Sequence, residues 1–326
     1  MRVCVYGAGA IGGHLAGRLA KGGADVSVIA RGPNLEAMRT RGLHVRVPDG
    51  DMHVRVRATD DPAELPPQDA VIVTVKAPAL PAVAAGVGPL LGSATPVVFA
   101  MNGIPWFYFH GAGGTHDGIR LPKLDPDGAL WDAVGPTRAV AGVVYSACTV
   151  VAPGEVEVES QASRLVLGEP DLSRPTRLES LAAVFRAGGL TIEISPRIRD
   201  AIWQKLLLNL GSGPLAILTG SAPSRFFAEP ACQEATRRIL AEGAAIAAAL
   251  GCQVKPNADG QIRNGSKSNH KPSILQDLEL GRPMEIDAIY GVPLDLARMQ
   301  GVETPTLDAL VGMVRVRARE AGLYPR

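Results

Sequence analysis

Short apolar runs alternate with helical periodicity along the first hundred residues. Near-continuous apolar runs at 69–75 and 95–100 predict strands that are buried on both faces, as in a parallel sheet. Shorter β-rich runs at 2–6 and 25–30 predict two more strands. Between these two, apolar residues spaced four positions apart in 12–19 predict a helix. The alternation of strand and helix indicates a doubly wound α/β domain.

Two local signals lie between these strands. Asn34 is expected to cap a helix that runs to about Arg41. Alternating residues in 43–47 and 52–58 flank the turn signal Pro48-Asp49-Gly50, which predicts a hairpin.

The pattern changes twice further along the chain. Residues 104–135 are rich in Gly, Pro and Asp and have no clear period, and irregular stretches of that length are usually functional or mobile. Strand signals return at 138–151, 155–159, 164–167 and 190–194, with a helix at 176–187. After Pro196 we expect only helices, at 197–210, 230–250, 272–280, 284–299 and 305–321. We therefore predict a Rossmann-type doubly wound domain over 1–195, with an insertion at about 104–135, and an all-helical domain over 196–326.

Composition excludes several classes of protein. Of 326 residues 46% are hydrophobic, and 33 Lys and Arg against 32 Asp and Glu leave a net charge of +1, which excludes bulk disorder. No basic surplus exists for nucleic acid, and no apolar run reaches the roughly 18–20 residues of a membrane span. The four cysteines are scattered and lie beside no clustered histidines, so we predict no disulfide framework, no metal site and a reduced, cytoplasmic setting.

A glycine-rich loop follows the first predicted strand and opens the first helix. It has the GxGxxG pattern, formed by Gly7, Ala8, Gly9, Ala10, Ile11 and Gly12. In such a loop the first glycine makes the tight turn, the second lets the backbone approach a pyrophosphate, and the third lets helix and strand pack closely. The helix N-terminus supplies free N–H groups for the phosphates. We predict dinucleotide binding, with a merely structural turn as the alternative.

The end of the second strand indicates which dinucleotide is bound. An acidic residue there would hold the ribose of NAD, but the sequence reads Ile29-Ala30-Arg31-Gly32. Arg31 can pair with a 2′-phosphate, which favours NADP(H), although an ordinary surface arginine is the alternative. Lys76 and Asn102 follow the two buried strands at the edge where ligands bind. We interpret Lys76 as a cofactor contact, with a solvated lysine as the alternative, and Asn102 as able to reach both nicotinamide and substrate.

The helical half carries two polar clusters. Lys205 and Asn209 lie on one face of an apolar helix, where the lysine either snorkels to solvent or faces a polar cleft. Ser273 would present its hydroxyl near a helix N-terminus that begins at Pro272. Glu285 lies in the first turn of the next helix, where an acid also suits the helix dipole.

Together these pieces resemble one family, the ketopantoate reductases (2-dehydropantoate 2-reductases). The resemblance covers nearly the whole chain and rests on five motifs: GAGAIGG at 7–13, VTVKA at 73–77, NG at 102–103, WQKLLLN at 203–209 and HKPSILQDLELGRPMEID at 270–287. It implies a Rossmann domain that binds NADPH, a helical domain that closes over it, and a 2-oxo acid between them. It also implies a homodimer.

The resemblance implies roles for residues at the matching positions. Lys205 would be the general acid, because hydride arriving at the ketone carbon produces an alkoxide that an ammonium group can stabilise and protonate. Asn102 would touch both cofactor and substrate. Asn209 and Ser273 would hold the carboxylate and hydroxyl end of the substrate, and Glu285 would position groups at the cofactor and active site.

Two departures from the family pattern concern the substrate. Where the family often has another asparagine, one turn after Asn209, this chain has Gly213, and only Ser212 stands nearby as a substitute. The insertion begins with the aromatic run 106–110, which would line or cover the pocket or else pack within the insertion or at a dimer interface.

We therefore predict an NADP-dependent oxidoreductase that reduces a 2-oxo acid to a 2-hydroxy acid, with ketopantoate, of pantothenate biosynthesis, as the leading substrate. A homologue acting on a bulkier or more apolar oxo acid is the alternative. A non-catalytic NADPH-binding redox sensor is a third.

Overall fold

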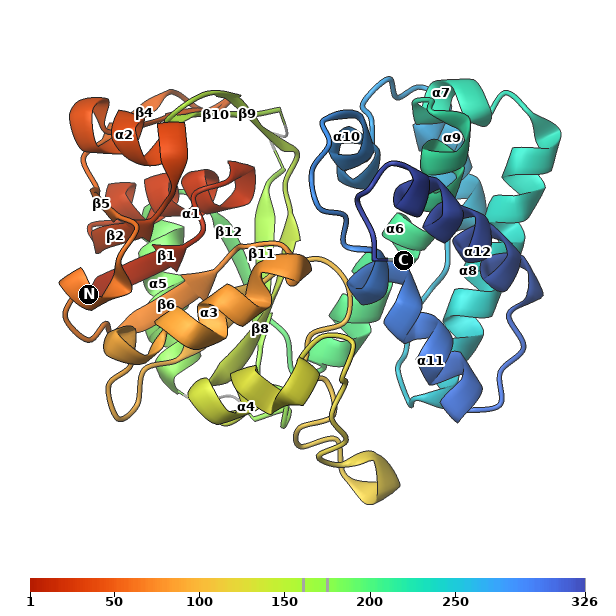
Figure 1. The fold of residues 1–326 in the computed structure, drawn as a ribbon, viewed down its shortest axis with the longest axis horizontal. Coiled ribbons are helices and arrows are strands. Elements are labelled where there is room, and N and C mark those ends of the chain that lie inside the picture. The colour runs from red at the N-terminus through yellow and green to blue at the C-terminus, as the bar shows by residue number, and fades with distance from the viewer. Residues whose placement is uncertain (160–161, 174–175, 326) are drawn as a thin grey trace. The chain divides into compact units, whose positions relative to one another are not determined.

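The computed structural model describes residues 1–159, 162–173 and 176–325, and the chain forms two compact units (Figure 1). One unit comprises 1–101 and 105–198, and the other comprises 102–104 and 199–326. Asn102–Ile104 thus pack with the second unit, although the chain on both sides of them belongs to the first.

An eight-stranded sheet forms the centre of the first unit. Its strands lie in the order β12 (Thr191–Ile194), β11 (Arg164–Gly168), β8 (Ala139–Tyr145), β7 (Val97–Ala100), β6 (Ala70–Val73), β1 (Arg2–Tyr6), β2 (Asp25–Ile29) and β5 (Arg57–Thr59). The strands from β5 to β8 are parallel, whereas β11 pairs antiparallel with β8 and parallel with β12. The chain leaves β1 toward β2 on one side and later returns to β6 on the other, so the topological switch point lies between β1 and β6.

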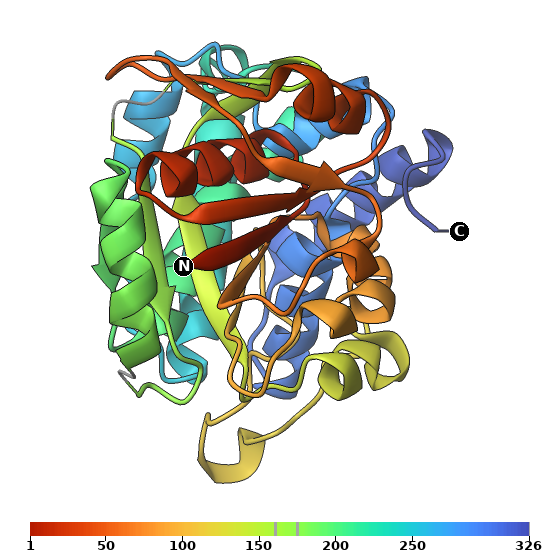
Figure 2. The ribbon, with the colours of Figure 1, turned by 90° about the vertical axis from the view of Figure 1, so that its left-hand side faces the viewer.

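Helices cover both faces of this sheet, which confirms the predicted doubly wound fold. Helices α1 (Ala10–Lys21) and α5 (Thr176–Ala187) lie on one face, and α3 (Leu80–Gly86) and α4 (Ala129–Ala133) lie on the other (Figure 2). Helix α2 (Gly32–Arg41) packs beside the edge strand β5. The short 3-10 helices of this unit are η1 (Pro62–Glu64), η2 (Ala77–Ala79), η3 (Gly88–Leu90), η4 (Gly114–His116) and η5 (Pro126–Gly128).

A second sheet packs against α1, and the sequence did not predict it. Its order is β4 (Met52–Val54), β3 (Leu43–Arg46), β10 (Glu155–Val158) and β9 (Cys148–Ala152). The hairpin of β3 and β4 was predicted correctly, but the expected strands 52–58 and 138–151 each divide between the two sheets. The division arises because α1 contacts strands of both sheets, so the chain must bend to pass from one to the other.

Small residues let α1 fit between the two sheets. A Cβ atom at Gly13 would come within 2.7 Å of Val156 Cγ2, and one at Gly17 within 2.8 Å of Val45 Cγ2. Both distances are shorter than real Cβ contacts, so a side chain at either position would force the facing valine of the small sheet to move away from the helix.

A buried polar cluster also connects α1 to the β3–β4 turn and to the segment between β8 and β9. Arg18 is only 4% exposed and donates two hydrogen bonds to Asp49 in the β3–β4 turn, at 2.9 and 2.8 Å, which lowers the pKa of Asp49 to about 2. Arg18 Nε also donates to His14 Nε2 at 3.3 Å, so the other ring nitrogen of a neutral His14 carries the hydrogen and donates to Ser146 Oγ at 3.1 Å. Burial, assisted by the charge of Arg18, lowers the pKa of His14 to about 4.

The aromatic run of the insertion is buried and packs against strand β7 and the rest of the insertion. Trp106, Phe107, Tyr108 and Phe109 are each at most 2% exposed. The Trp106 ring packs edge-on against Phe99 and Trp131, with ring centroids 5.6 and 5.9 Å apart. These side chains therefore pack within the first unit, which is one of the roles expected from the sequence.

The second unit is helical, as predicted. It contains α6 (Ile198–Thr219), α7 (Pro223–Phe226), α8 (Pro230–Ala249), α9 (Ala258–Gly265), α10 (Ser273–Glu279), the π-helix η6 (Asp287–Gly291), α11 (Val292–Met299) and α12 (Pro305–Glu320). Part of its core is a cluster of Leu215, Ala216, Phe226, Phe227, Ile262 and Leu275. The predicted end of the first helix at Leu210 was wrong, because α6 continues through Pro214, and α7 and α9 were not predicted.

Every helix in the described ranges is too short or too polar to cross a bilayer. The four cysteines are free; Cys4 and Cys252 are buried, whereas Cys148 and Cys232 are partly exposed.

Candidate active site

A cavity of about 220 Å³ opens at the switch point of the large sheet. Its walls come from the carboxyl ends of three strands: Gly7–Gly9 after β1, Ile29–Arg31 after β2, and Val75 after β6. Open α/β sheets bind their ligands at this edge and at this point of strand reversal.

The three glycines of the loop meet three different requirements. Gly7 has a φ of +113°, which L side chains rarely adopt. A Cβ atom at Gly12 would overlap the carbonyl oxygen of Gly7 and lie 2.6 Å from Thr74 Oγ1. At Gly9, by contrast, no described atom lies within 4 Å of the Cβ position. The loop is therefore closed toward the sheet and open at the glycine where a pyrophosphate would approach.

Two side chains outside the GxGxxG motif brace this loop. Thr74 Oγ1 donates a hydrogen bond of 2.6 Å to the Gly7 carbonyl. Asn34 Nδ2 donates to the Ala8 carbonyl at 3.4 Å, and Asn34 Oδ1 accepts from the Gly154 N–H at 3.1 Å. The predicted capping role of Asn34 was wrong, because α2 begins at Gly32 and Asn34 lies inside the helix, where it contacts the loop instead.

Arg31 is the charged residue at the end of β2 that lines the cavity, and it is exposed. Burial raises the pKa of the Tyr6 phenol, and the positive charge of the nearby Arg31 opposes this effect. Lys76 follows Val75 directly and precedes η2, and it is half-buried. The described cavity wall thus offers a cation where an NAD site would have a carboxylate.

The other predicted side chains belong to the second unit. Lys205 and Asn209 lie one turn apart on α6, and both are half-buried. The Asn209 Nδ2 atom is buried and has no hydrogen-bond partner among the described residues. Ser273 is the exposed first residue of α10, and Glu285 is 6% exposed and immediately precedes the segment that forms η6.

The elements that carry these residues converge around Gly213. A Cβ atom at Gly213 would overlap the Tyr290 hydroxyl of η6 and lie 3.6 Å from Ile274 Cγ2 of α10. Gly213 is one turn after Asn209, and Ile274 is next to Ser273. The charge of Glu285 in turn acts on Tyr290. Within the second unit, α6, α10 and η6 therefore meet at one place.

Asn102 belongs to the same neighbourhood through the chain that follows it. The Ile104 N–H donates to the Ala288 carbonyl of η6 at 2.9 Å. Gly103 has a φ of +83°, and a Cβ atom there would overlap that carbonyl oxygen. The Asn-Gly pair that ends β7 is therefore anchored to the π-helix, a contact that the sequence did not predict.

Comparison with known proteins shows what family combines these features. The family described as "Ketopantoate reductase PanE/ApbA" matches residues 3–110, and "Ketopantoate reductase PanE/ApbA C terminal" matches 197–318. A 2-dehydropantoate 2-reductase of Mesorhizobium japonicum is 41% identical over 99% of this chain and 100% of its own length. This chain belongs to the ketopantoate reductase family.

Solved structures agree with this assignment. A structure from Ralstonia solanacearum MolK2 shares 40% identity and a TM-score of 0.91, with 99% of each chain covered. The 2-dehydropantoate 2-reductase of Geobacter metallireducens GS-15 shares 28% identity and a TM-score of 0.84 over 96% of this chain and 99% of its own. D-mandelate dehydrogenase, solved with NADH and anilino(oxo)acetate, has the same fold at 19% identity and a TM-score of 0.82. As a ketopantoate reductase family member, the chain is an oxidoreductase.

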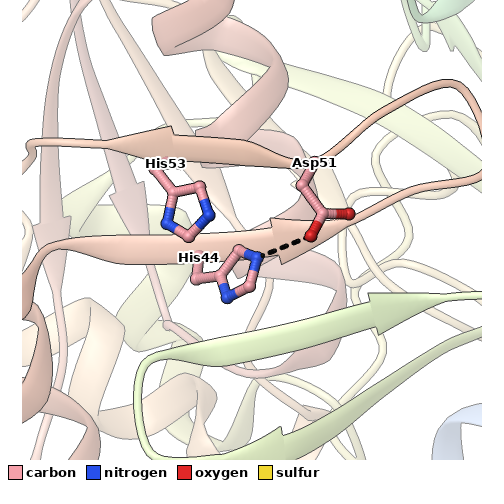
Figure 3. A group of neighbouring side chains, drawn as sticks. All are labelled: His44, Asp51 and His53. Atoms are coloured by element: carbon pink, nitrogen blue, oxygen red, sulfur yellow. Dashed lines mark hydrogen bonds and ion pairs between the residues drawn. The ribbon is translucent and has the colours of Figure 1, made fainter.

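A group of side chains that could hold a metal ion lies apart from the site residues predicted from the sequence. His44, Asp51 and His53 on the β3–β4 hairpin have ligand atoms within 4.8 Å of one another, the one such group among the described residues (Figure 3). The sequence did not indicate this group, because only the hairpin register places the two histidines side by side.

The different surroundings of two loop glycines lead to a test. Gly9→Ala is expected to leave the melting temperature unchanged, because its Cβ meets no described atom, but to weaken binding of a nicotinamide dinucleotide by blocking the phosphate approach. Gly12→Ala is expected to lower the melting temperature as well, because its Cβ overlaps Gly7 O. Thermal melting and NADPH fluorescence titration measure the two effects. Equal melting temperatures for the two variants would contradict this account of the loop.

Proposed function

We propose that this protein reduces a 2-oxo acid to a 2-hydroxy acid with NADPH, and that the substrate is ketopantoate. The observation that carries the proposal is the 41% identity to a 2-dehydropantoate 2-reductase over essentially the full length of both chains. The first unit is proposed to bind the cofactor, and the helical unit to bind the substrate and to form a homodimer contact. A reduced, cytoplasmic setting is consistent with four free cysteines.

The cofactor site fits a phosphorylated dinucleotide. Gly7, Ala8 and Gly9 line the cavity, and Ala10, Ile11 and Gly12 form the first turn of α1. That turn contains no acidic residue and has no side-chain cap, so its N–H groups and dipole favour a pyrophosphate. Arg31 would pair with the 2′-phosphate, and Lys76 would contact the cofactor from the end of β6. Bound NADPH would supply the hydride.

The substrate site is proposed from the residues of the second unit. Lys205 would stabilise the developing alkoxide and donate its proton. Asn209 and Ser273 would bind the oxygen-bearing ends of the substrate, and the orphaned Nδ2 of Asn209 is a donor of the kind that a substrate oxygen requires. Asn102 would contact both cofactor and substrate, while Glu285, buried beside η6, would position groups at the cofactor and active site.

Two alternatives are less well supported. The aromatic run had favoured a bulkier or more apolar substrate, but its side chains are used in the core of the insertion. A non-catalytic redox sensor would have no use for a lysine and an asparagine one turn apart on α6, at the meeting point of substrate-binding elements.

A turnover assay tests the proposed function. The wild-type enzyme is expected to oxidise NADPH in the presence of ketopantoate, and Lys205→Ala is expected to lower kcat by about 100-fold or more, on the scale typical of general acid catalysis. NADPH affinity should be nearly unchanged, because Lys205 is assigned to the substrate. Lys267→Ala removes another lysine of the same unit and serves as the matched control.

The outcomes of that assay separate the alternatives. No turnover of ketopantoate or of any other 2-oxo acid, together with tight NADPH binding, would contradict the proposed reaction and favour the sensor. Turnover of aryl or long-chain oxo acids alone would contradict ketopantoate as the substrate. A Lys205→Ala enzyme with nearly normal kcat would refute the role of Lys205.

Cofactor choice gives a second prediction. Arg31→Ala is expected to weaken NADPH binding roughly 10- to 100-fold by removing charge-assisted hydrogen bonds to the 2′-phosphate, and to change NADH binding little. Arg41→Ala, at the other end of α2, is the matched control. Fluorescence titration with both nucleotides measures the effect, and equal losses for the two would show that Arg31 does not recognise the phosphate.

A further inference from the structure

The Tyr290 hydroxyl is buried without a hydrogen-bond partner in the described part of the chain. The residue is 0% exposed and lies on the π-helix η6. Burying an unpaired hydroxyl costs free energy, so native structures rarely tolerate one without a reason. Single π-helical turns are frequently found at functional sites, so the position of this hydroxyl on η6 favours a functional role.

Glycine at position 213 makes room for this hydroxyl. Any side chain there would place its Cβ atom on Tyr290 Oη. The phenol therefore occupies the space next to α6 that a side chain one turn after Asn209 would otherwise fill. Ser212, the substitute suggested by the sequence, is already used, since its hydroxyl donates to the Leu208 carbonyl at 3.2 Å.

A second orphaned polar atom belongs to α6, one turn before Gly213. Asn209 Nδ2 is also buried and unpaired among the described residues. The amide N–H of Asn209 and the phenol O–H of Tyr290 are both donors. Asn209 on α6 and Tyr290 beside Gly213 thus each have a buried donor for which the described residues supply no acceptor.

Electrostatics indicates which acceptor suits Tyr290. The charge of Glu285, together with the larger effect of burial, holds the pKa of the Tyr290 phenol well above its usual range, so the phenol stays protonated. The same negative charge disfavours an anionic ligand oxygen at this place. A neutral hydroxyl suits it better, and a phenol can both donate to and accept from a hydroxyl.

We propose that Tyr290 is a specificity-determining residue that hydrogen-bonds the terminal hydroxyl of ketopantoate. This inference rests on the proposed function. It assigns to η6 the recognition of a hydroxylated substrate, with Asn209 as the neighbouring donor. A site built to hydrogen-bond a substrate hydroxyl discriminates against an analogue without it, because the buried polar group is then left unpaired.

The experiment compares ketopantoate with trimethylpyruvate, which has a methyl group in place of the hydroxymethyl group. Tyr290→Phe is expected to lower kcat/KM for ketopantoate by about 10- to 100-fold and to change that for trimethylpyruvate little. The melting temperature of the apo variant should stay the same or rise, because only an unpaired buried hydroxyl is removed. If the hydroxyl had a purely structural role, its removal would lower the melting temperature and would affect the two substrates equally.

Tyr324→Phe is the matched control. Its hydroxyl donates to Asp287 Oδ1 at 2.7 Å, so its removal is expected to lower the melting temperature without a difference between the two substrates. Equal losses on both substrates in Tyr290→Phe, or no loss, would overturn the assignment of Tyr290. A wild-type enzyme that reduces neither substrate would instead refute the proposed function.

An independent observation concerns the outer face of the small sheet. His44 of β3 and His53 of β4 lie directly opposite each other in the hairpin, with ring centroids 3.8 Å apart (Figure 3). Asp51 Oδ2 lies 3.0 Å from His44 Nε2. The alternate residues Val45 and Met52 face α1, so the histidines project from the opposite face.

We infer that His44, Asp51 and His53 form a binding site for a zinc-like divalent transition metal. Imidazole nitrogen and carboxylate oxygen are the donors that such ions prefer, whereas magnesium and calcium prefer oxygen donors alone. Glu155, next to His44 on β10, adds negative charge, with Oε2 3.9 Å from His44 Nδ1, and is itself paired with Arg46 at 2.8 Å. A bound ion would join the two strands of the hairpin whose turn carries Asp49.

Titration of the full-length, chelator-treated protein tests this site. Zn²⁺ is expected to bind in calorimetry and to raise the melting temperature, and Co²⁺ to give visible absorption bands. His53→Asn is expected to weaken Zn²⁺ binding about tenfold or more. His116→Asn, whose ring stacks on Phe109 away from the hairpin, is the matched control. No Zn²⁺ binding by the wild type, or equal binding by wild type and His53→Asn, would overturn the inference.

Discussion

The close approach of the first helix to the first strand is the constraint on which the first unit depends. Gly12 can carry no side chain, because the Gly7 carbonyl occupies the space where its Cβ would lie. That contact sets α1 tightly against the large sheet, and Gly13 and Gly17 then admit the small sheet on its other side. Because Gly7 and Gly12 face the sheet and Gly9 is open, the helix N-terminus is available to a phosphate at the switch point of the sheet.

The second unit depends in a similar way on one short element. The Ala288 carbonyl of the π-helix η6 accepts a hydrogen bond from the Ile104 N–H. This bond holds the Asn-Gly pair that follows β7. It also directs Tyr290 into the space above Gly213. One turn of irregular helix therefore anchors Asn102–Ile104 and carries the tyrosine that we propose recognises the substrate.

The sequence predicted those parts of the fold that short stretches of the chain specify by themselves. The buried parallel strands and the glycine loop depend on short stretches, and both were predicted. The small sheet was missed because 138–151 was predicted as one strand, although β8 pairs with the distant β7 and β9 forms a hairpin with β10, which in turn pairs with the distant β3. Asn34 is a residue type that often caps helices, but here it bonds the glycine loop through a tertiary contact. The helix predicted to end at Leu210 continues as α6 through Pro214 to Thr219. Absence of a side chain at Gly213 was visible in the sequence, but the phenol that fills the space was not.

Transfer of a labelled hydride tests the central claim most directly. The enzyme is given ketopantoate and NADPH that carries deuterium at the transferable position of the nicotinamide, and the product is analysed by mass spectrometry and NMR. The account predicts a 2-hydroxy acid with deuterium on the former carbonyl carbon. Oxidation of NADPH without labelled product, or no product at all, would contradict the claim that this chain is a 2-oxo acid reductase.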